Sequence, residues 1–385
     1  MRSVALLGST GSIGTQAIDV IVRSPEAFDV IALAAGGADP RALADQAARL
    51  RPRLVAVARP DAAGPVREAL AAAGVAADVV AGPDAASQAA GIGADIVLNG
   101  MTGSVGLRPT LAALEAGSTL ALANKESLVA GGALVRAAMR RPDQIVPVDS
   151  EHSALAQALR GGRAEEVRRL VVTASGGAFR GRSRAELEHV TVEQALKHPN
   201  WDMGPVVTIN SATMVNKALE VIEAHLLFDI AMDRIEVVVH PQSIVHSMVE
   251  FHDGSTIAQA SPPDMRLPIA LGLSWPERLP DVAPAIDWTT AHTWEFAPLD
   301  DDAFPAVRLA RQAVAASALH PAVFNAANEQ AVAAFSEGRL PFLGIVETVR
   351  SVVESYTAPD EVSLAAVDEA ERWARAQADA LIARA

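Results

Sequence analysis

The stretch that decides the fold is Val4-Ala5-Leu6-Leu7-Gly8-Ser9-Thr10-Gly11-Ser12-Ile13-Gly14. Its four apolar residues predict a buried strand, and the apolar periodicity that follows predicts a helix ending before Pro25. Glycines between a strand and a helix let the backbone approach a pyrophosphate, whose charge the free N–H groups of the helix start bind. The G-x-x-G-x-x-G spacing in this context predicts a dinucleotide site, and a tight turn that binds nothing is the alternative.

The same alternation of strands and helices continues through residues 1–150. The apolar runs are rich in Val, Ile, Leu and Ala, as expected for strands buried on both faces, and alanine-rich amphipathic stretches separate them. This order predicts an α/β domain with a Rossmann-like, doubly wound parallel sheet. The strands are expected at Val4–Leu7, Val30–Ala34, Leu54–Ala58, Val79–Ala81, Ile96–Leu98, Thr119–Ala123 and Ile145–Val148.

Residues 151–273 have a different pattern, which predicts an α+β catalytic domain. Its elements are expected as strands at Leu170–Thr173 and Ile235–Val239, a hairpin of Ser243–Phe251 with Thr256–Ala260, and a helix at 212–228. Repeated prolines mark residues 274–303 as a linker between domains. Residues 304–385 predict a C-terminal helical bundle of about four amphipathic helices.

Composition excludes several classes of protein. With no cysteine, the chain has no disulfide, iron–sulfur cluster, thiolate zinc site or cysteine nucleophile. A net charge of −14 without a basic patch argues against nucleic acid as a partner. There is no apolar run of about 18 residues to span a membrane, and the start lacks a signal-peptide cleavage pattern. We therefore expect a cytoplasmic enzyme.

Lysine is rare in this chain. Only Lys125, Lys197 and Lys217 are lysines among the 32 basic residues, and the rest are arginines. Because arginine differs from lysine in shape, reach and ability to lose a proton, a retained lysine is a candidate for a role that arginine cannot fill. We expect at least two of the three to be functional, and chance is the alternative.

Polar residues follow two of the predicted parallel strands. Lys125 lies in Asn124-Lys125-Glu126, and two carboxylates lie in Asp149-Ser150-Glu151-His152. The carboxyl ends of such strands line the ligand crevice, so Lys125 is predicted to face cofactor or substrate. Asp149 and Glu151 offer hard oxygen ligands for Mg²⁺ or Mn²⁺. For both stretches an ordinary helix start is the alternative.

The middle helix carries a polar face. Asn216 and Glu220 are four residues apart and share that face, with Lys217 beside them and Ser211 at the predicted helix start. Ser211 and Lys217 suit a phosphate and Glu220 suits a metal. The alternative is a surface helix with ordinary solvated charges.

Two further stretches suggest substrate contacts. The turn Thr173–Gly177 offers hydroxyl and N–H donors to a phosphate. The loop from Lys197 to Gly204 carries Trp201 among chain-breaking residues, which predicts a lid that closes over ligand and expels water. Packing against a neighbouring element is the alternative. His240 and His246 are either buried, hydrogen-bonded histidines or members of the site.

The second predicted strand ends at Gly36-Gly37 with no Asp or Glu to accept a ribose 2′-hydroxyl. This favours NADP over NAD. The nearest basic residue in the sequence is Arg41.

Taken together, these stretches resemble the 1-deoxy-D-xylulose 5-phosphate reductoisomerases of the methylerythritol phosphate route to isoprenoids. The resemblance runs from the first strand to the C-terminal helices, in the family's order and spacing. The matching stretches are Gly8–Gly14, 124–126, 149–152, Thr173–Gly177, His198–Gly204, Ile209–Glu220, His240–Ser247 and Pro263-Asp264-Met265-Arg266.

The resemblance implies a homodimer whose subunit has an NADPH domain, a catalytic domain with a lid near residues 197–205, and a C-terminal helical domain. NADPH would contact Thr10, Gly11, Ser12, Ile13, Gly36, Asn124, Glu126 and Gly204, and Asp149, Glu151 and Glu220 would hold Mg²⁺ or Mn²⁺. The phosphorylated sugar substrate would contact Lys125, Ser150, Glu151, Ser175, His198, Trp201, Ser211, Asn216, Lys217 and Glu220. Lys125, Glu151 and Glu220 would be catalytic, and His198, Trp201 and Met203 would form the lid.

The implied reaction is an isomerisation followed by a reduction. A metal chelates the ketone and a neighbouring hydroxyl as a Lewis acid. Retro-aldol cleavage and recombination give a branched aldehyde phosphate, which NADPH reduces to 2-C-methyl-D-erythritol 4-phosphate.

The sequence departs from the family after Gly36, where members often carry a basic residue and then Asn. Here these positions are Gly37 and Ala38, so the group that recognises the 2′-phosphate is not identified. Two other functions remain open. A metal-independent dehydrogenase would be insensitive to a chelator, and a nucleotide-binding regulator would bind cofactor without turnover.

Overall fold

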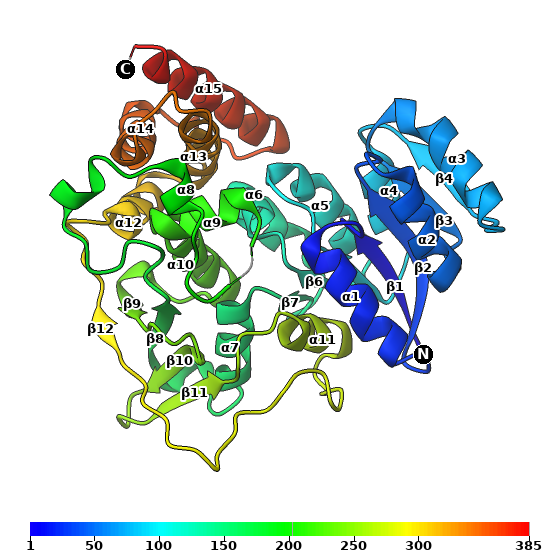
Figure 1. Cartoon of the computed structure of the whole chain (residues 1–385), viewed down its shortest axis with the longest axis horizontal. Helices are drawn as coiled ribbons and strands as arrows, with labels where there is room; N and C mark the ends of the chain where they lie inside the picture. The colour runs from blue at the N-terminus through cyan, green and yellow to red at the C-terminus, as the bar shows by residue number, and fades with distance from the viewer. Residues whose placement is uncertain (202, 385) are drawn as a thin grey trace. The chain divides into compact units, whose positions relative to one another are not determined.

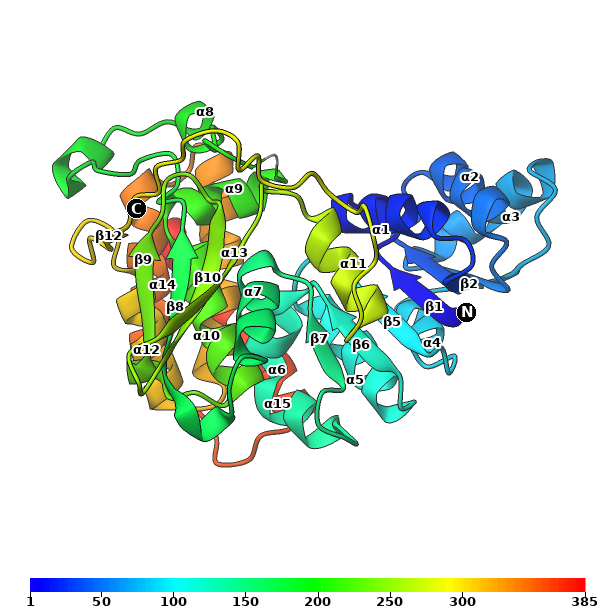
Figure 2. The ribbon, with the colours of Figure 1, turned by 90° about the horizontal axis from the view of Figure 1, so that it is seen from below.

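The computed structural model describes residues 1–201 and 203–384, and the chain forms two compact units (Figures 1 and 2). The first unit contains Met1–Ser127, Val135–Ser153 and Asp264–Ala283. The second contains Leu128–Leu134, Ala154–Pro263 and the chain from Pro284 onward. The chain therefore passes from one unit to the other several times.

The first unit is built on a seven-stranded parallel sheet in the order β4-β3-β2-β1-β5-β6-β7. The predicted doubly wound sheet is confirmed. Its strands are β1 (Arg2–Leu7), β2 (Phe28–Ala35), β3 (Leu54–Val57), β4 (Asp78–Ala81), β5 (Ile96–Asn99), β6 (Thr119–Leu122) and β7 (Ile145–Pro147). Its helices are α1 (Ser12–Arg23), α2 (Pro40–Leu50), α3 (Ala63–Ala72), α4 (Ala85–Ala90), α5 (Leu107–Glu115) and α11 (Arg266–Ser274). Two more helices, α6 (Lys125–Ala138) and α7 (Ser150–Leu159), begin in this unit.

The strand order places a ligand crevice in the first unit. β1 pairs with β2 on one side and with β5 on the other, so the order reverses at β1. Open parallel sheets bind ligands at the carboxyl ends of their strands beside such a reversal. The glycine motif follows β1 directly and therefore lies at this point.

The second unit is built on a five-stranded mixed sheet in the order β11-β10-β8-β9-β12 (Figure 2). Its strands are β8 (Val167–Ala174), β9 (Ile235–Val239), β10 (Val245–Phe251), β11 (Thr256–Ala260) and β12 (Ala297–Pro298). Its helices are α8 (Val192–Ala195), α9 (Pro205–Ala212), α10 (Val215–Phe228), α12 (Ala306–Ala316), α13 (His320–Ser336), α14 (Phe342–Ser355) and α15 (Leu364–Ile382). One apolar core is shared by this sheet, by α10 and by the C-terminal helical bundle, and its members Val172, Val221 and Phe324 are all buried. The predicted hairpin and C-terminal helices are confirmed.

The helix predicted at 212–228 corresponds to α10, and a helix that was not predicted, α9, precedes it. α9 ends at Ala212 and α10 begins at Val215, because Met214 adopts a left-handed conformation with φ of 61°. A left-handed residue breaks the helical hydrogen-bond ladder, and the sequence carries no glycine there to announce it. Ser211, predicted at a helix start, lies in the last turn of α9 instead.

The segment 264–283 belongs to the first unit, although the sequence analysis divided it between the catalytic domain and the linker. α11 packs against α1 and β6 there, and Gly272 is the point of close approach, because a Cβ on it would lie 2.8 Å from the Val148 side chain. The other domain boundaries stay predictions. Among the described residues, no helix is long and apolar enough to cross a membrane.

Candidate active site

The loop between β1 and α1 is shaped by its glycines. Gly8 has φ of 76°, and a Cβ on it would lie 2.6 Å from the Gly100 carbonyl oxygen. A Cβ on Gly14 would collide with the backbone of Gly8 and Ser9. The N-cap of α1 is Gly11, whose lack of a side chain leaves the first N–H groups of the helix open to an anion. The exposed tip of the loop, Thr10 to Ser12, therefore fits a pyrophosphate.

Position 37, two residues after the end of β2, has no place for a side chain. Gly37 has φ of 88°, and a Cβ on it would lie 2.6 Å from the Cβ of Ala62. The next carboxylate, Asp39, accepts the Ala42 N–H at 2.9 Å as the N-cap of α2. A basic residue at position 37 would strain the backbone and clash, which explains the departure from the family pattern.

Arg59 is a candidate that the sequence analysis missed. It follows β3, the neighbour of β2, and its N–H donates to the Gly36 carbonyl at 3.3 Å. Its guanidinium is exposed and pairs with Asp61. The signal that would have found it is strand pairing, since parallel neighbours end at the same edge of a sheet.

Asn124 and Lys125 start α6. The Asn124 oxygen accepts the Ser127 N–H as an N-cap, and its amide donates to the carbonyls of Met101 and Gly103, each at 2.9 Å. Asn124 therefore caps α6, and its buried amide orders the loop after β5. Lys125 forms an ion pair in addition, because its Nζ lies 2.6 Å from Oδ2 of Asp149, and both side chains are almost buried.

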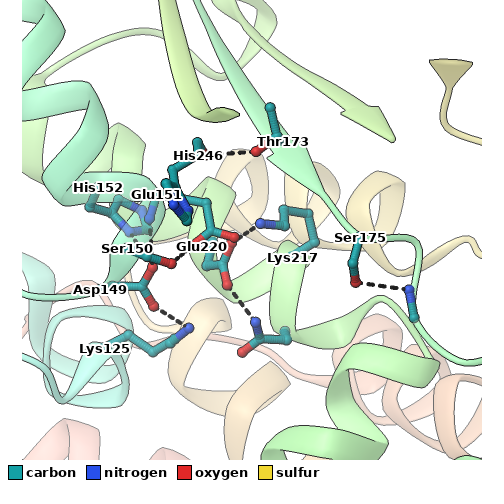
Figure 3. A network of polar contacts seen from close by, with 12 residues as sticks. Lys125, Asp149, Ser150, Glu151, His152, Thr173, Ser175, Lys217, Glu220 and His246 are labelled. Carbon is teal, nitrogen blue, oxygen red and sulfur yellow. Dashed lines mark hydrogen bonds and ion pairs between the residues drawn. The ribbon is translucent and has the colours of Figure 1, made fainter. Parts of the chain in front are cut away.

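Asp149 lies before α7 and is surrounded by donors. Burial opposes its ionisation, but Lys125 and then His152 outweigh burial and hold the pKa of Asp149 well below its ordinary value. Its Oδ1 lies 3.3 Å from Nδ1 of His152. Ser150 donates its hydroxyl proton to Glu151 (Figure 3). The strand end thus presents an ionised carboxylate in contact with a lysine ammonium.

In the second unit, α10 carries a second carboxylate–ammonium pair (Figure 3). Lys217 donates to one oxygen of Glu220, and the Asn216 amide donates to the other. The whole-residue exposure is 4% for Lys217 and 1% for Glu220. Because solvated surface charges are not buried to this extent, the surface-helix alternative is wrong for these residues.

His198 is held in one tautomer. Its Nδ1 accepts the N–H groups of Asn200 at 3.1 Å and Trp201 at 2.9 Å, so Nε2 carries the proton and donates to Ser175 Oγ at 3.0 Å. Ser175 Oγ also accepts the Gly177 N–H at 3.2 Å. Because its oxygen accepts both N–H groups, the Ser175 hydroxyl keeps its own proton to donate to an anion.

The loop after His198 is hydrogen-bonded to the turn before β10. Asn200 donates its amide to Pro241 O at 2.6 Å and Ser243 Oγ at 2.7 Å, and the Trp201 ring lies 6.0 Å from that of His246. His246 Nε2 lies 3.1 Å from Ser261 O, so it is a buried, hydrogen-bonded histidine. The sequence analysis missed Asn200, and Asp202 of the predicted lid lies outside the described residues.

The predicted site residues divide between the two units. The first unit holds the glycine loop, Gly36, Asn124, Lys125, Glu126, Asp149, Ser150 and Glu151. The second holds Ser175, His198, Trp201, Gly204, Ser211, Asn216, Lys217 and Glu220. A dinucleotide cradle in one unit and an anion-binding, acidic site in the other define a dinucleotide-dependent oxidoreductase.

Family models narrow this class. Three that describe 1-deoxy-D-xylulose 5-phosphate reductoisomerase or its C-terminal domains match residues 4–132, 145–228 and 260–377. The chain is 65% identical to the reductoisomerase of Beutenbergia cavernae over 99% of this chain and 98% of the relative, and 62% identical to that of Streptomyces coelicolor over 100% and 93%. The chain belongs to the 1-deoxy-D-xylulose 5-phosphate reductoisomerase family.

Solved structures agree over the whole chain. The reductoisomerase of Zymomonas mobilis in complex with NADPH matches with a TM-score of 0.92 and 43% identity, over 99% of both chains. A reductoisomerase in complex with NADPH, fosmidomycin and magnesium matches with a TM-score of 0.92 and 34% identity, over 99% of this chain and 98% of that one. The chain is an enzyme with an NADPH-dependent oxidoreductase activity.

Proposed function

We propose that this enzyme isomerises and reduces 1-deoxy-D-xylulose 5-phosphate to 2-C-methyl-D-erythritol 4-phosphate with NADPH. The observation that supports this function is the pair of almost buried carboxylate–ammonium contacts, Lys125 with Asp149 and Lys217 with Glu220, on a chain with a dinucleotide cradle. The product is a precursor in the non-mevalonate route to isoprenoids.

The donors present fit a divalent metal. Asp149, Glu151 and Glu220 offer carboxylate oxygens, which Mg²⁺ and Mn²⁺ prefer. Asp149 and Glu220 each already carry a cation, the ammonium of Lys125 or Lys217, so these carboxylates are ionised and suited to positive charge. We propose that the three carboxylates hold Mg²⁺ or Mn²⁺ together in the working enzyme, where the ion would act as a Lewis acid.

The chain's own groups have separate tasks in this proposal. Lys125 places an ammonium where negative charge develops on the substrate. The phosphate is held by the hydroxyls of Ser175 and Ser211 and by Lys217 and Asn216, which keeps the cleaved fragment in place. His198 orients the Ser175 hydroxyl by donating its Nε2–H to it. Trp201 and Met203 belong to the lid that excludes water. NADPH is expected to contact Thr10, Gly11, Ser12, Ile13, Gly36, Asn124, Glu126 and Gly204.

The function is tested by following NADPH oxidation with deoxyxylulose phosphate. We expect turnover with Mg²⁺ or Mn²⁺ and none after treatment with a chelator, restored by adding metal back. Turnover that persists in chelator would favour a metal-independent dehydrogenase. Cofactor binding without any turnover would favour a regulator.

We further propose a homodimer that works in the cytoplasm, with Mn²⁺ able to replace Mg²⁺. The support is family membership at high identity over the whole chain. Light scattering at micromolar protein is expected to give twice the mass of one chain, and a monomer at all concentrations would contradict the dimer.

Arg59 is proposed to contact the 2′-phosphate of NADPH. Gly37 has no space for a side chain, and Asp39 is occupied as a cap. The backbone N–H of Arg59 donates to the Gly36 carbonyl, and its exposed guanidinium has donors beyond those that Asp61 uses. We expect Arg59→Ala to weaken NADPH binding about tenfold and leave NADH binding unchanged, since only NADPH carries the phosphate. Titrations of cofactor fluorescence measure both affinities.

Arg41→Ala is the matched control for Arg59→Ala, because Arg41 is an exposed arginine in the first turn of α2 near the same loop. Its NADPH affinity is expected to change less than that of Arg59→Ala. An equal loss of NADH and NADPH binding in Arg59→Ala would refute the assignment.

A further inference from the structure

Helix α13 carries two buried amides with different partners. Asn325 and Asn328 are each 1% exposed. The Asn325 amide donates to Glu329, one turn further along the same helix, at 3.0 Å. The Asn328 amide instead donates to Oδ1 of Asn210 in α9 at 2.9 Å, across 118 residues of sequence. Asn328 thus joins the C-terminal bundle to the helix that carries Ser211.

The stability of the fold does not explain why position 328 carries an amide. Its Oδ1 is buried and accepts no hydrogen bond from any described residue. A buried acceptor without a donor costs free energy, and an apolar side chain of the same size would avoid that cost. A polar group retained at such a position points to a requirement for a particular arrangement of α9 and α13.

The end of α9 is where precision matters for the proposed reaction. Asn210 immediately precedes Ser211, and the left-handed Met214 then leads into α10 with Asn216 and Lys217. Gly177, with φ of 68°, approaches so closely that a Cβ on it would lie 2.5 Å from the Ser211 carbonyl oxygen. The Ser175 turn and Asn328 therefore both contact the last turn of α9.

We propose that Asn328 is a positioning residue for substrate phosphate. Through Asn210 it fixes the last turn of α9, so that the Ser211 hydroxyl and the start of α10 present their donors in one arrangement. The proposal rests on the proposed function, because it assigns Ser211 to the phosphate. It gives the C-terminal bundle a part in substrate binding without a direct contact.

The test uses Asn328→Leu, which removes both polar groups and keeps the number and branching of the side-chain heavy atoms. We expect the KM for deoxyxylulose phosphate to rise about tenfold, with kcat within about threefold of wild type. NADPH affinity is expected to stay unchanged. The midpoint of thermal unfolding should change little, since the variant loses an unpaired acceptor as well as a hydrogen bond.

The control is Asn325→Leu, which is equally buried on the same helix but bonded within it. Its KM is expected to match wild type. In a double-mutant cycle, Asn328→Leu should add little to the KM of Ser211→Ala, because both changes act on one contact. Isothermal titration of deoxyxylulose phosphate into the metal-loaded protein gives the same comparison without turnover.

Three results would overturn the proposal. They are an unchanged KM in Asn328→Leu, an equal rise in Asn325→Leu, and fully additive effects with Ser211→Ala. If Asn328→Leu does not fold, Asn328→Ala, which only truncates the side chain, replaces it in the same measurements. A wild-type protein without turnover would instead contradict the proposed function, so the two failures are distinguishable.

Discussion

Glu220→Gln is expected to reduce turnover by about 10³-fold, or about 4 kcal/mol of transition-state stabilisation, while NADPH affinity changes less than twofold. The substitution keeps the shape of the side chain and removes its charge, so a proposed metal ligand is lost. Apart from Gly204, the residues proposed to contact NADPH lie in the other compact unit, which is why the affinity for NADPH should be retained. Stopped-flow turnover and cofactor fluorescence measure the two effects separately.

The buried Lys217 makes stability a necessary control for this prediction. Without the Glu220 charge its ammonium is poorly compensated, and breaking a buried pair costs about 3–5 kcal/mol. Thermal unfolding must therefore show that Glu220→Gln is folded at the assay temperature. Glu329→Gln, which removes the partner of Arg375 at 2.6 Å, is the loss of a half-buried ion pair outside the proposed site and should keep wild-type turnover.

Metal dependence gives a second readout. In the presence of substrate, Mg²⁺ should raise the unfolding midpoint of wild type and leave that of Glu220→Gln unchanged, because only a ligand that binds the folded state stabilises it. Wild-type turnover in Glu220→Gln, or the loss of NADPH binding in that variant, would contradict the assignment of Glu220 as a metal ligand.

Much of the fold follows from local sequence signals. The seven apolar runs before residue 150 are all strands of the parallel sheet. Six of them are mostly buried, which requires apolar side chains on both faces, whereas β4 at the sheet edge is exposed or half-buried. The glycine loop could also be predicted from the sequence, since close backbone contacts require glycine at positions 8 and 14. These features depend on neighbours along the chain or on the adjacent strand.

What the sequence could not predict depends on distant partners. Met214 adopts a left-handed conformation that its residue type does not predict, so α10 begins at Val215 and a separate helix, α9, precedes it. Arg59 meets Gly36 only through strand pairing, and Asn328 meets Asn210 across 118 residues. Periodicity contains no information about such pairs, because the packing of whole elements decides them.

The lysine pattern lies between these two cases. The rarity of lysine in the sequence made Lys125, Lys197 and Lys217 candidates for functional roles, but it did not predict which residues they contact. The structure places Lys125 and Lys217 against carboxylates, and it leaves Lys197 exposed. Two of the three lysines therefore stand where a compact ammonium and a larger guanidinium would differ most.

Lys125→Arg tests that difference directly. The change conserves charge, but the Lys125 Nζ lies 2.6 Å from Asp149 in a contact where the lysine side chain is only 13% exposed. A planar guanidinium is larger and directs its donors as a fork, so it would displace Asp149 or move away from the reacting carbons. We expect kcat to fall at least about tenfold, or about 1.4 kcal/mol.

Lys197→Arg is the natural control, since the same substitution at an exposed lysine should leave kcat at the wild-type value. NADPH affinity should be unchanged in both variants, which separates a catalytic effect from a damaged cofactor cradle. Full activity in Lys125→Arg would mean that positive charge alone suffices at this position, and the argument from the rarity of lysine would fail with it. A tenfold loss confined to Lys125→Arg would show that the compact ammonium is the requirement.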